Sequence, residues 1–209
     1  MLPEIPGLRF FPDPLHRYYL DGFGYLDRSV TEVVGHNMTA KTRDYIESSK
    51  HIWLPRGLAG HHALEQHLLG QPVTPDETYQ PWIDALLDQD IWKGSETLAV
   101  EYRLCDERKS LAGSFDFLIR RPDGQVILGD LKTVETVLAA NSRKPATEQL
   151  GAYAAMLIDS HPHLTIDWCC TVVAGPGVTR VIPQKPTECI SAWLDCWDAY
   201  KLLQPVWDF

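Results

Sequence analysis

The stretch AGSFDFLIRRPDGQVILGDLKT, from Ala112 to Thr133, decides the fold of this chain. Two apolar runs flank Pro122-Asp123-Gly124, a combination that is typical of a tight turn. We therefore predict two strands that fold back on each other. The first strand carries one acid, and the second ends on an acid, a spacer and a lysine.

Three charged side chains are expected to meet at one point of this hairpin. Asp130 and Lys132 point to the same side because side chains alternate along a strand. The turn can place Asp116 beside them. Two carboxylates and an ammonium in one place are the groups needed to hold a divalent metal and to hydrolyse a phosphodiester.

The expected elements follow an alternating order around the hairpin. They are a small hairpin at 16–26, a helix start at 29–32, a helix over 41–69 interrupted near Pro55, a helix over 77–89, strands over 97–104, 110–120 and 125–131, a loop over 133–145, a helix over 146–160, strands over 165–174 and 179–183, and a helix over 187–203. This order predicts an α/β fold, a central mixed β-sheet flanked by helices (αβββαβ). We expect one domain over 1–209, with an N-terminal extension (1–50), a catalytic core (51–175) and a C-terminal strand and helix (176–209).

Apolar spacing predicts which side of each helix faces the core. The sets expected to face inward are Leu58, His61, Leu64, Glu65 and Leu68; Trp82, Ile83 and Leu86; Leu150, Tyr153, Ala154 and Leu157; and Ile190, Trp193, Leu194 and Trp197. Core packing is also favoured over base stacking for Tyr45 and Trp53. Only one of the adjacent His61 and His62 can face the sheet, and the phase favours His61.

Composition sets limits on location and partners. No run of 18 apolar residues exists, which predicts no membrane span, and the N-terminus lacks the pattern of a secretory signal. The five cysteines are irregularly spaced and are interpreted as reduced, mostly buried thiols of a cytoplasmic protein.

The net charge of −9 counts against a nucleic-acid binder, which is usually basic, although a local basic patch can suffice. The candidates for such a patch are Lys41, Arg43, Lys50, Arg56, Arg143 and Lys144. The alternative is that these are ordinary solvated charges.

Five pieces of sequence in this order resemble the PD-(D/E)XK nuclease superfamily, and more closely its RecB-type branch, which includes phage exonucleases and the mitochondrial genome maintenance exonuclease. The pieces are RGLAGHHALE with His61, AVEYRL with Glu101, AGSFDFLI with Asp116, GDLKT with Asp130 and Lys132, and EQLGAY with Gln149 and Tyr153. The resemblance implies a restriction-endonuclease-like core. The chain has no four-cysteine cluster, which disfavours the iron–sulfur sub-branch.

The resemblance also implies a metal site and a mechanism. Asp116, Asp130 and the carbonyl of Leu131 would bind Mg²⁺ or Mn²⁺, which prefer hard oxygen ligands. His61 would add an imidazole, whereas Glu101 and Glu65 are either ligands or plain surface charges. Lys132 would orient or deprotonate the attacking water, or hold the phosphate. Gln149 and Tyr153, one helical turn apart, would steady Lys132 or contact the DNA backbone.

The function expected from these residues is a metal-dependent DNA exonuclease of recombination, repair or phage DNA processing, in the cytoplasm of a bacterial or phage-infected cell. Its partners would be DNA, as a single strand or a duplex end, and a recombination protein or a second copy of the chain. Arg56, Arg143, Lys144 and Tyr153 are the candidate DNA contacts. Two alternatives stay open: a catalytically idle nucleic-acid-binding or assembly module, and a restriction-type endonuclease.

Overall fold

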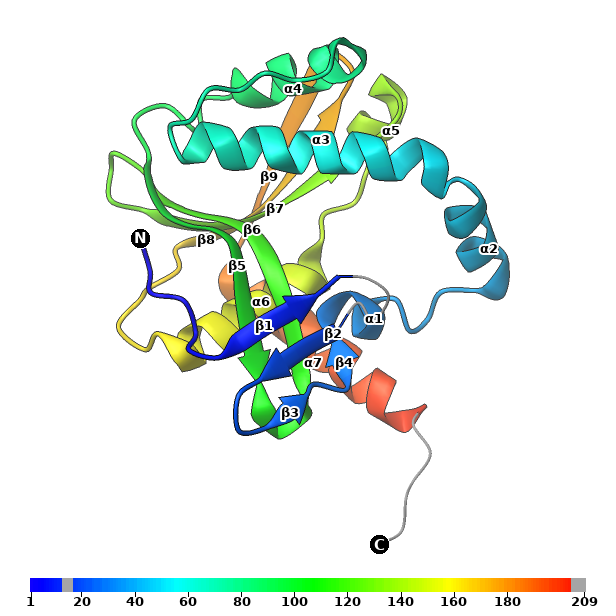
Figure 1. The fold of residues 1–209 in the computed structure, drawn as a ribbon, viewed down its shortest axis with the longest axis vertical. Coiled ribbons are helices and arrows are strands. Elements are labelled where there is room, and N and C mark those ends of the chain that lie inside the picture. The colour runs from blue at the N-terminus through cyan, green and yellow to red at the C-terminus, as the bar shows by residue number, and fades with distance from the viewer. Residues whose placement is uncertain (13–16, 204–209) are drawn as a thin grey trace, which may run out of the picture.

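A computed structural model describes residues 1–12 and 17–203 of the protein and shows a mixed sheet flanked by helices (Figure 1). The sheet contains β4 (Arg28–Ser29), β5 (Glu96–Asp106), β6 (Leu111–Arg120), β7 (Val126–Thr133), β8 (Trp168–Gly175) and β9 (Val178–Gln184). Pairs β5–β6, β6–β7 and β8–β9 are antiparallel, whereas β7–β8 and β4–β6 are parallel. The predicted α/β class with a mixed sheet is confirmed.

Helices cover both faces of this sheet (Figure 1). One face carries α3 (Lys50–Leu68), the short helix η1 (Glu77–Tyr79) and α4 (Gln80–Leu87), and the other carries α1 (Val30–Val34), α6 (Thr147–Ser160) and α7 (Pro186–Leu202). The remaining helices are α2 (Ala40–Ser48), η2 (Glu107–Lys109) and α5 (Val137–Ser142). Within the described residues, no helix combines the length and apolarity that crossing a bilayer requires.

The central hairpin forms as predicted. Gly124 donates its N–H to the carbonyl of Arg121 at 2.9 Å and has a φ of 89°, a left-handed conformation that favours glycine. Gly129 lies against the ring of Phe117, and a Cβ there would come within 1.8 Å of that ring. The glycine of GDLKT is therefore required for β7 to pack beside β6.

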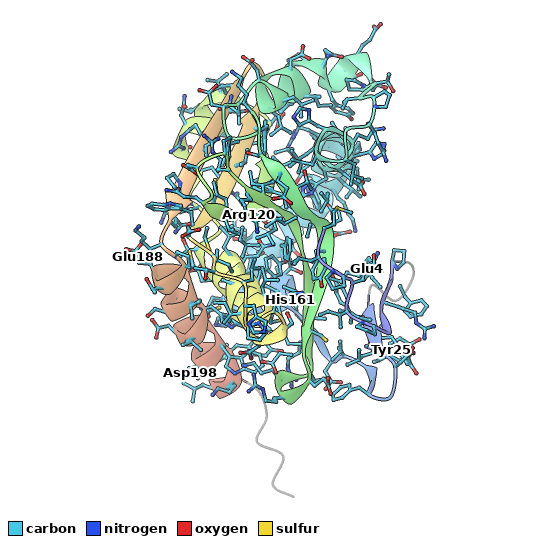
Figure 2. The ribbon with its side chains drawn as sticks, turned by 90° about the vertical axis from the view of Figure 1, so that its left-hand side faces the viewer. Glu4, Tyr25, Arg120, His161, Glu188 and Asp198 are labelled. Carbon is cyan, nitrogen blue, oxygen red and sulfur yellow. The ribbon has the colours of Figure 1, made fainter. Side chains whose placement is uncertain are left out.

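A second, smaller sheet forms at the N-terminus from β1 (Leu8–Phe11), β2 (Arg17–Leu20) and β3 (Gly24–Tyr25). The β2–β3 pair confirms the expected hairpin, although His16 lies outside the described residues. Strand β1 was not predicted. In Figure 2 this sheet, marked by Tyr25, stands on the opposite side of β5 and β6 from α6 and α7.

The expected helix start is also present. Ser29 is the N-cap of α1, and its hydroxyl accepts the N–H of Glu32. Ser29 therefore has two roles: it caps α1, and it pairs with Ala112 of β6 as the last residue of β4.

Two predictions of local structure are wrong. The first long helix breaks at Ser49 and continues through Pro55, because proline removes only one hydrogen bond and the carbonyl it leaves, on exposed His51, can bind water. The loop expected over 133–145 contains α5, which begins where the hydroxyl of Thr136 caps the N–H of Ala139.

Two residues expected to face inward are exposed. Leu58 is 62% exposed and Leu194 is 50% exposed, although Leu64, Trp193 and the four residues of α6 are buried as expected. Tyr45, expected in the core, is 70% exposed. In α7 the buried residues are Cys189, Trp193 and Tyr200, a stripe rotated away from Leu194, because adjacent helical residues point about 100° apart.

Candidate active site

The candidate site lies at an opening along one edge of β6. This edge pairs first with β4, at Leu111 and Ala112, and then with β7, from Phe117 to Arg120. Between these two segments, the residues of β6 line a cavity of about 250 Å³. The hairpin and β4 thus leave a gap in the sheet at the position of Asp116.

The structure brings together most of the residues that the sequence singles out. The cavity is lined by His61, Asp116, Asp130, Lys132, Gln149 and Tyr153. They come from α3, from β6 and β7, and from α6, so the site lies where helices of both layers meet the hairpin.

His61 lies between two carboxylates. Its Nδ1 is 3.3 Å from Oδ1 of Asp116 and 3.4 Å from Oε1 of Glu101. One ligand atom from each of the three residues lies within 4.8 Å of the others, a spacing that fits one metal ion. His62, in contrast, has a side chain that is 68% exposed, so the expected helix phase holds at this position.

Close packing of α3 on β7 positions His61. A Cβ at Gly60 would lie 2.8 Å from Cγ2 of Thr133, so only glycine allows this approach without displacement. Glycine inside a helix costs about 0.5–1 kcal/mol relative to alanine. The following residue, His61, is then held over Asp116.

Glu101 has an unusual backbone for a residue inside a strand. Its φ is 47°, whereas its neighbours Val100 and Tyr102 pair with β6 in register. Such a conformation costs of the order of 1–3 kcal/mol in a residue with a side chain. Because Val100 pairs with Phe117 and Tyr102 with Phe115, Glu101 lies opposite Asp116, and its carboxylate lies 3.4 Å from Nδ1 of His61.

Asp116 and Asp130 are both buried carboxylates, but their electrostatic environments differ. Burial raises the pKa of Asp130 to about 6, against the attraction of Lys132 and together with the repulsion from Asp116. Burial acts in the same direction on Asp116, but the charges of His61 and Lys132, with the N–H of Leu131, lower its pKa below the ordinary value.

The carboxylates of Asp116 and Glu101 act on the imidazole of His61. Burial by itself would lower the pKa of His61, but Asp116 and Glu101 raise it well above its usual range. Without a metal, the imidazolium compensates the negative charge of this group.

A chain of hydrogen bonds holds Lys132. Its ammonium lies 3.1 Å from Oδ1 and 2.8 Å from Oδ2 of Asp130, and donates to Oε1 of Gln149 at 2.9 Å. The amide of Gln149 in turn donates to the hydroxyl of Tyr153 at 3.1 Å. Burial raises the pKa of Tyr153 well above its usual range, so this hydroxyl stays protonated.

The donor set fits a hard divalent cation. His61, Glu101 and Asp116 supply an imidazole and two carboxylates, the kinds of ligand that Mn²⁺ and Mg²⁺ accept. Oδ2 of Asp130 is buried and is ion-paired with the ammonium of Lys132 at 2.8 Å, so a cation there would share this oxygen with the lysine. The carbonyl of Leu131 stays a predicted ligand.

Two predicted contacts are not assembled as expected. Glu65 pairs with His62 at 3.7 Å and lines, together with Glu101 and Arg103, a cavity other than the one that contains Asp116 and Asp130. Arg56 is only 7% exposed and burial lowers its pKa, so it does not belong to a surface patch.

The remaining basic candidates lie on the surface. Arg143 and Lys144 are exposed directly after α5, and their contact with DNA stays a prediction. In the earlier group, Arg43 donates to the carbonyl of Met38 and Lys50 pairs with Glu47 at 3.4 Å, as ordinary surface cations do.

The N-terminal segment supplies lining residues that sequence reasoning missed. Phe10, Tyr18, Ser29 and Thr31 all face the candidate site. Burial raises the pKa of Tyr18 to about 12. For this segment the sequence predicted only a small hairpin at 16–26 and a helix start at 29–32, which single out none of these side chains.

The cysteines lie away from this cavity. All five are free, and Cys169, Cys170 and Cys189 are buried, which agrees with the predicted reduced thiols.

Comparison with known proteins gives only distant likenesses. No family model matches the chain, and no curated protein does. Among solved structures, SSO0001 is similar with a TM-score of 0.40 and 16% identity, covering 85% of this chain and 76% of that one. LHK-Exo in complex with dAMP is similar with a TM-score of 0.35 and 15% identity, covering 84% and 90% respectively. At these TM-scores, neither likeness bears on the assignment of the site.

Proposed function

We propose that this protein is a divalent-metal-dependent nuclease that hydrolyses phosphodiester bonds of DNA, and that it acts as an exonuclease. One observation carries the proposal: His61, Glu101 and Asp116 offer three ligand atoms within 4.8 Å, next to the ion-paired Asp130 and Lys132. A metal group beside a lysine ammonium is suited to a phosphodiester, whose charge needs neutralisation during attack.

Each residue has a distinct part in this proposal. His61, Glu101 and Asp116 would hold Mg²⁺ or Mn²⁺, and Asp130, which is ion-paired with Lys132, would be a further carboxylate ligand. When bound, the metal lowers the pKa of a water and stabilises charge on the phosphate. The chain itself would bind and orient the phosphate.

Lys132 is the residue that would contact the substrate. Its ammonium has three N–H donors, and Asp130 and Gln149 accept two of them. The third can be donated to a phosphate oxygen in the cavity. Gln149 is then a positioning residue, and Tyr153 holds the amide of Gln149 in the orientation that accepts from Lys132.

Digestion from a DNA end rests on the resemblance of the five sequence pieces to RecB-type exonucleases. The contacts of Arg143 and Lys144 with DNA, and a recombination protein or a second copy as partner, are parts of the same proposal. The intact acid–lysine set speaks against an idle module.

The test is incubation of the protein with end-labelled linear DNA and with closed-circular DNA, in Mn²⁺, in Mg²⁺ and in EDTA. Release of label from linear DNA alone, only with metal, is the expected result. Cleavage of the circle would make the enzyme an endonuclease. No cleavage of either substrate, with Mn²⁺ binding shown by calorimetry, would favour an idle module.

A further inference from the structure

A second cavity, also of about 250 Å³, lies between η2, β4 and α7. Its described lining contains four cations, two aromatic rings and a serine, but no acid: Arg28, Arg108, Lys109, Ser110, Trp197, Tyr200 and Lys201. We call it the basic-aromatic cavity. In a chain with a net charge of −9, such a concentration of cations indicates an anionic ligand.

The rings hold two of these cations in place. The guanidinium of Arg28 lies 5.9 Å from the centroid of Tyr200, and the ammonium of Lys109 lies 6.0 Å from that of Trp197. The two rings stack on each other with centroids 5.8 Å apart. Tyr200 is only 6% exposed and Trp197 packs against the same core, so the rings serve to fix the cations, and cations fixed in a cavity match the phosphate of a nucleotide.

The other two cations have surface partners outside the cavity. Arg108 pairs with Asp159 at 2.5 Å and Lys201 pairs with Asp198 at 2.8 Å, and all four side chains are more than half exposed. Such exposed pairs are worth little, so a phosphate can take over either cation. Both Arg108 and Lys109 also pair with the buried Asp106, Arg108 at 3.4 Å and Lys109 more closely, so Lys109 still neutralises Asp106 when Arg108 is replaced.

A third cavity shares lining residues both with the basic-aromatic cavity and with the candidate active site. This cavity, of about 510 Å³, lies between the two, and it shares Tyr18, Ser29 and Thr31 with the active site. It shares Arg28 with the basic-aromatic cavity. Arg17 and Arg28 face Asp27 and Glu32 in this middle part, so the net positive charge is concentrated at the far end.

The separation is suited to several nucleotides. Strand β6 runs from Leu111, beside η2, to Asp116, which is about 17 Å at the rise of a β-strand. At 3.4 Å per stacked nucleotide, this is roughly five nucleotides.

We infer that a single strand of nucleic acid leaves the active site along β4 and that the basic-aromatic cavity holds its backbone roughly five nucleotides away. This inference rests on the proposed function. A free mononucleotide would occupy the basic-aromatic cavity alone. The three cavities, however, share lining residues in sequence, which matches a strand that runs along all of them.

The chain offers a matched pair of variants for the test. The test variant is Arg108→Gln with Lys201→Gln. The control is Arg120→Gln with Lys93→Gln, which removes the same charge from an Arg–Glu pair at 2.6 Å and an i,i+3 Lys–Asp pair at 2.7 Å. Arg120 ends β6 at the far end from η2, and Figure 2 shows it well above Asp198 of α7.

Binding is measured first, by fluorescence anisotropy of a labelled 12-nucleotide dT strand in EDTA, so that no turnover is needed. We expect the dissociation constant of the test variant to rise about three- to tenfold, as for the loss of two exposed charge contacts. The logarithm of the association constant falls as the logarithm of the salt concentration rises, and this slope should be less steep by about 1.4 in the test variant. Each phosphate contact to a single strand contributes about 0.7 to the slope. The control should bind like the wild type.

Cleavage with Mn²⁺ then separates a strand path from a local anion site. A trinucleotide is too short to reach the basic-aromatic cavity from the active site. The test variant should therefore raise KM for the 12-nucleotide strand, with kcat and trinucleotide cleavage unchanged.

Three results would overturn the inference: equal weakening of strand binding by the control variant, equal loss of cleavage on both substrate lengths, or strand binding by the test variant equal to that of the wild type. If the wild type binds the strand but cleaves nothing with Mg²⁺ or Mn²⁺, the proposed nuclease function fails, and the anisotropy comparison still decides on the strand path.

Discussion

The ammonium of Lys132, at the end of β7, donates to the amide oxygen of Gln149, in the first turn of α6, at 2.9 Å. This contact joins the two motifs that the sequence analysis took from opposite sides of a predicted loop. It also gives Gln149 a defined task, because a lysine fixed on two sides presents its remaining N–H in one direction.

We expect Gln149→Met to lower kcat about 10- to 100-fold, because Lys132 keeps its charge but loses one of its two fixed acceptors. Mn²⁺ affinity, measured by calorimetry, should be unchanged. Tyr153→Phe removes only the acceptor of the Gln149 amide and should cost less than about tenfold. A larger loss in Tyr153→Phe than in Gln149→Met would contradict this order of contacts.

Lys132→Ala should lower turnover by about 10²- to 10⁴-fold while leaving Mn²⁺ affinity nearly intact, since the lysine contacts the substrate and not the cation. Single-turnover cleavage and calorimetric titration of Mn²⁺ measure the two effects separately. Loss of the metal site without a separate defect in rate would assign Lys132 to metal binding.

Asp130→Asn should stabilise the metal-free protein, whereas Asp116→Asn should destabilise it. The folded-state pKa of Asp130 is raised from 3.8 to about 6, so its charged form opposes folding. The loss in free energy of unfolding caused by ionised Asp130 is absent below about pH 3.8 and grows as the pH rises to about 6. Above that pH it stays constant at roughly 2–3 kcal/mol. The ionised form of Asp116 has the opposite effect: its folded-state pKa is lowered, so its charge raises the free energy of unfolding.

Thermal unfolding in EDTA at pH 4 and pH 7.5 tests this difference. The gain in Tm of Asp130→Asn over the wild type should appear at pH 7.5 and shrink at pH 4. With Mn²⁺ present, both variants should lose the stabilisation by metal that the wild type shows. A gain for Asp130→Asn that is equal at both pH values would rule out the ionisation of Asp130 as its cause.

His61→Ala should impair cleavage and shift the preference between Mn²⁺ and Mg²⁺, because imidazole tunes selection among divalent ions. His62→Ala is the matched control, since His62 is the adjacent residue and lies on the exposed side of α3. Metal titrations of activity for both variants make the comparison. Greater damage from His62→Ala would show that the helix phase at the site is wrong.

Gly60→Ala should reduce activity by displacing α3, because the new Cβ would lie 2.8 Å from Cγ2 of Thr133. Thr133→Ser removes that methyl group, so the double variant Gly60→Ala with Thr133→Ser should recover most of the activity. The readout is kcat/KM, with circular dichroism to confirm the fold. A double variant no better than Gly60→Ala alone would refute steric placement of His61.

The hairpin from Ala112 to Thr133 shows what local sequence can determine. Its turn, its antiparallel pairing and the shared side of Asp130 and Lys132 follow from alternation and from the chemistry of Pro122-Asp123-Gly124. The helical phase placed His61 toward the site for the same reason, since a helix repeats over a few residues. Where apolar residues cover a broader part of the helix surface, periodicity alone predicted buried positions for Leu58 and Leu194, which are exposed.

What only the tertiary structure decided lies between segments that are distant in the chain. Periodicity cannot show that β4 pairs with the start of β6 and β7 with its end, which opens the edge at Asp116. It also cannot show that Glu101 adopts a φ of 47°, or that Arg56 is buried. The physical reason is that backbone periodicity is a local property, whereas a site depends on long-range packing that orders segments only after loop closure and burial are complete. The sequence by itself determined which residues are candidates for the chemistry, and the packing of α3, β4 and α6 around the hairpin decided which of them meet.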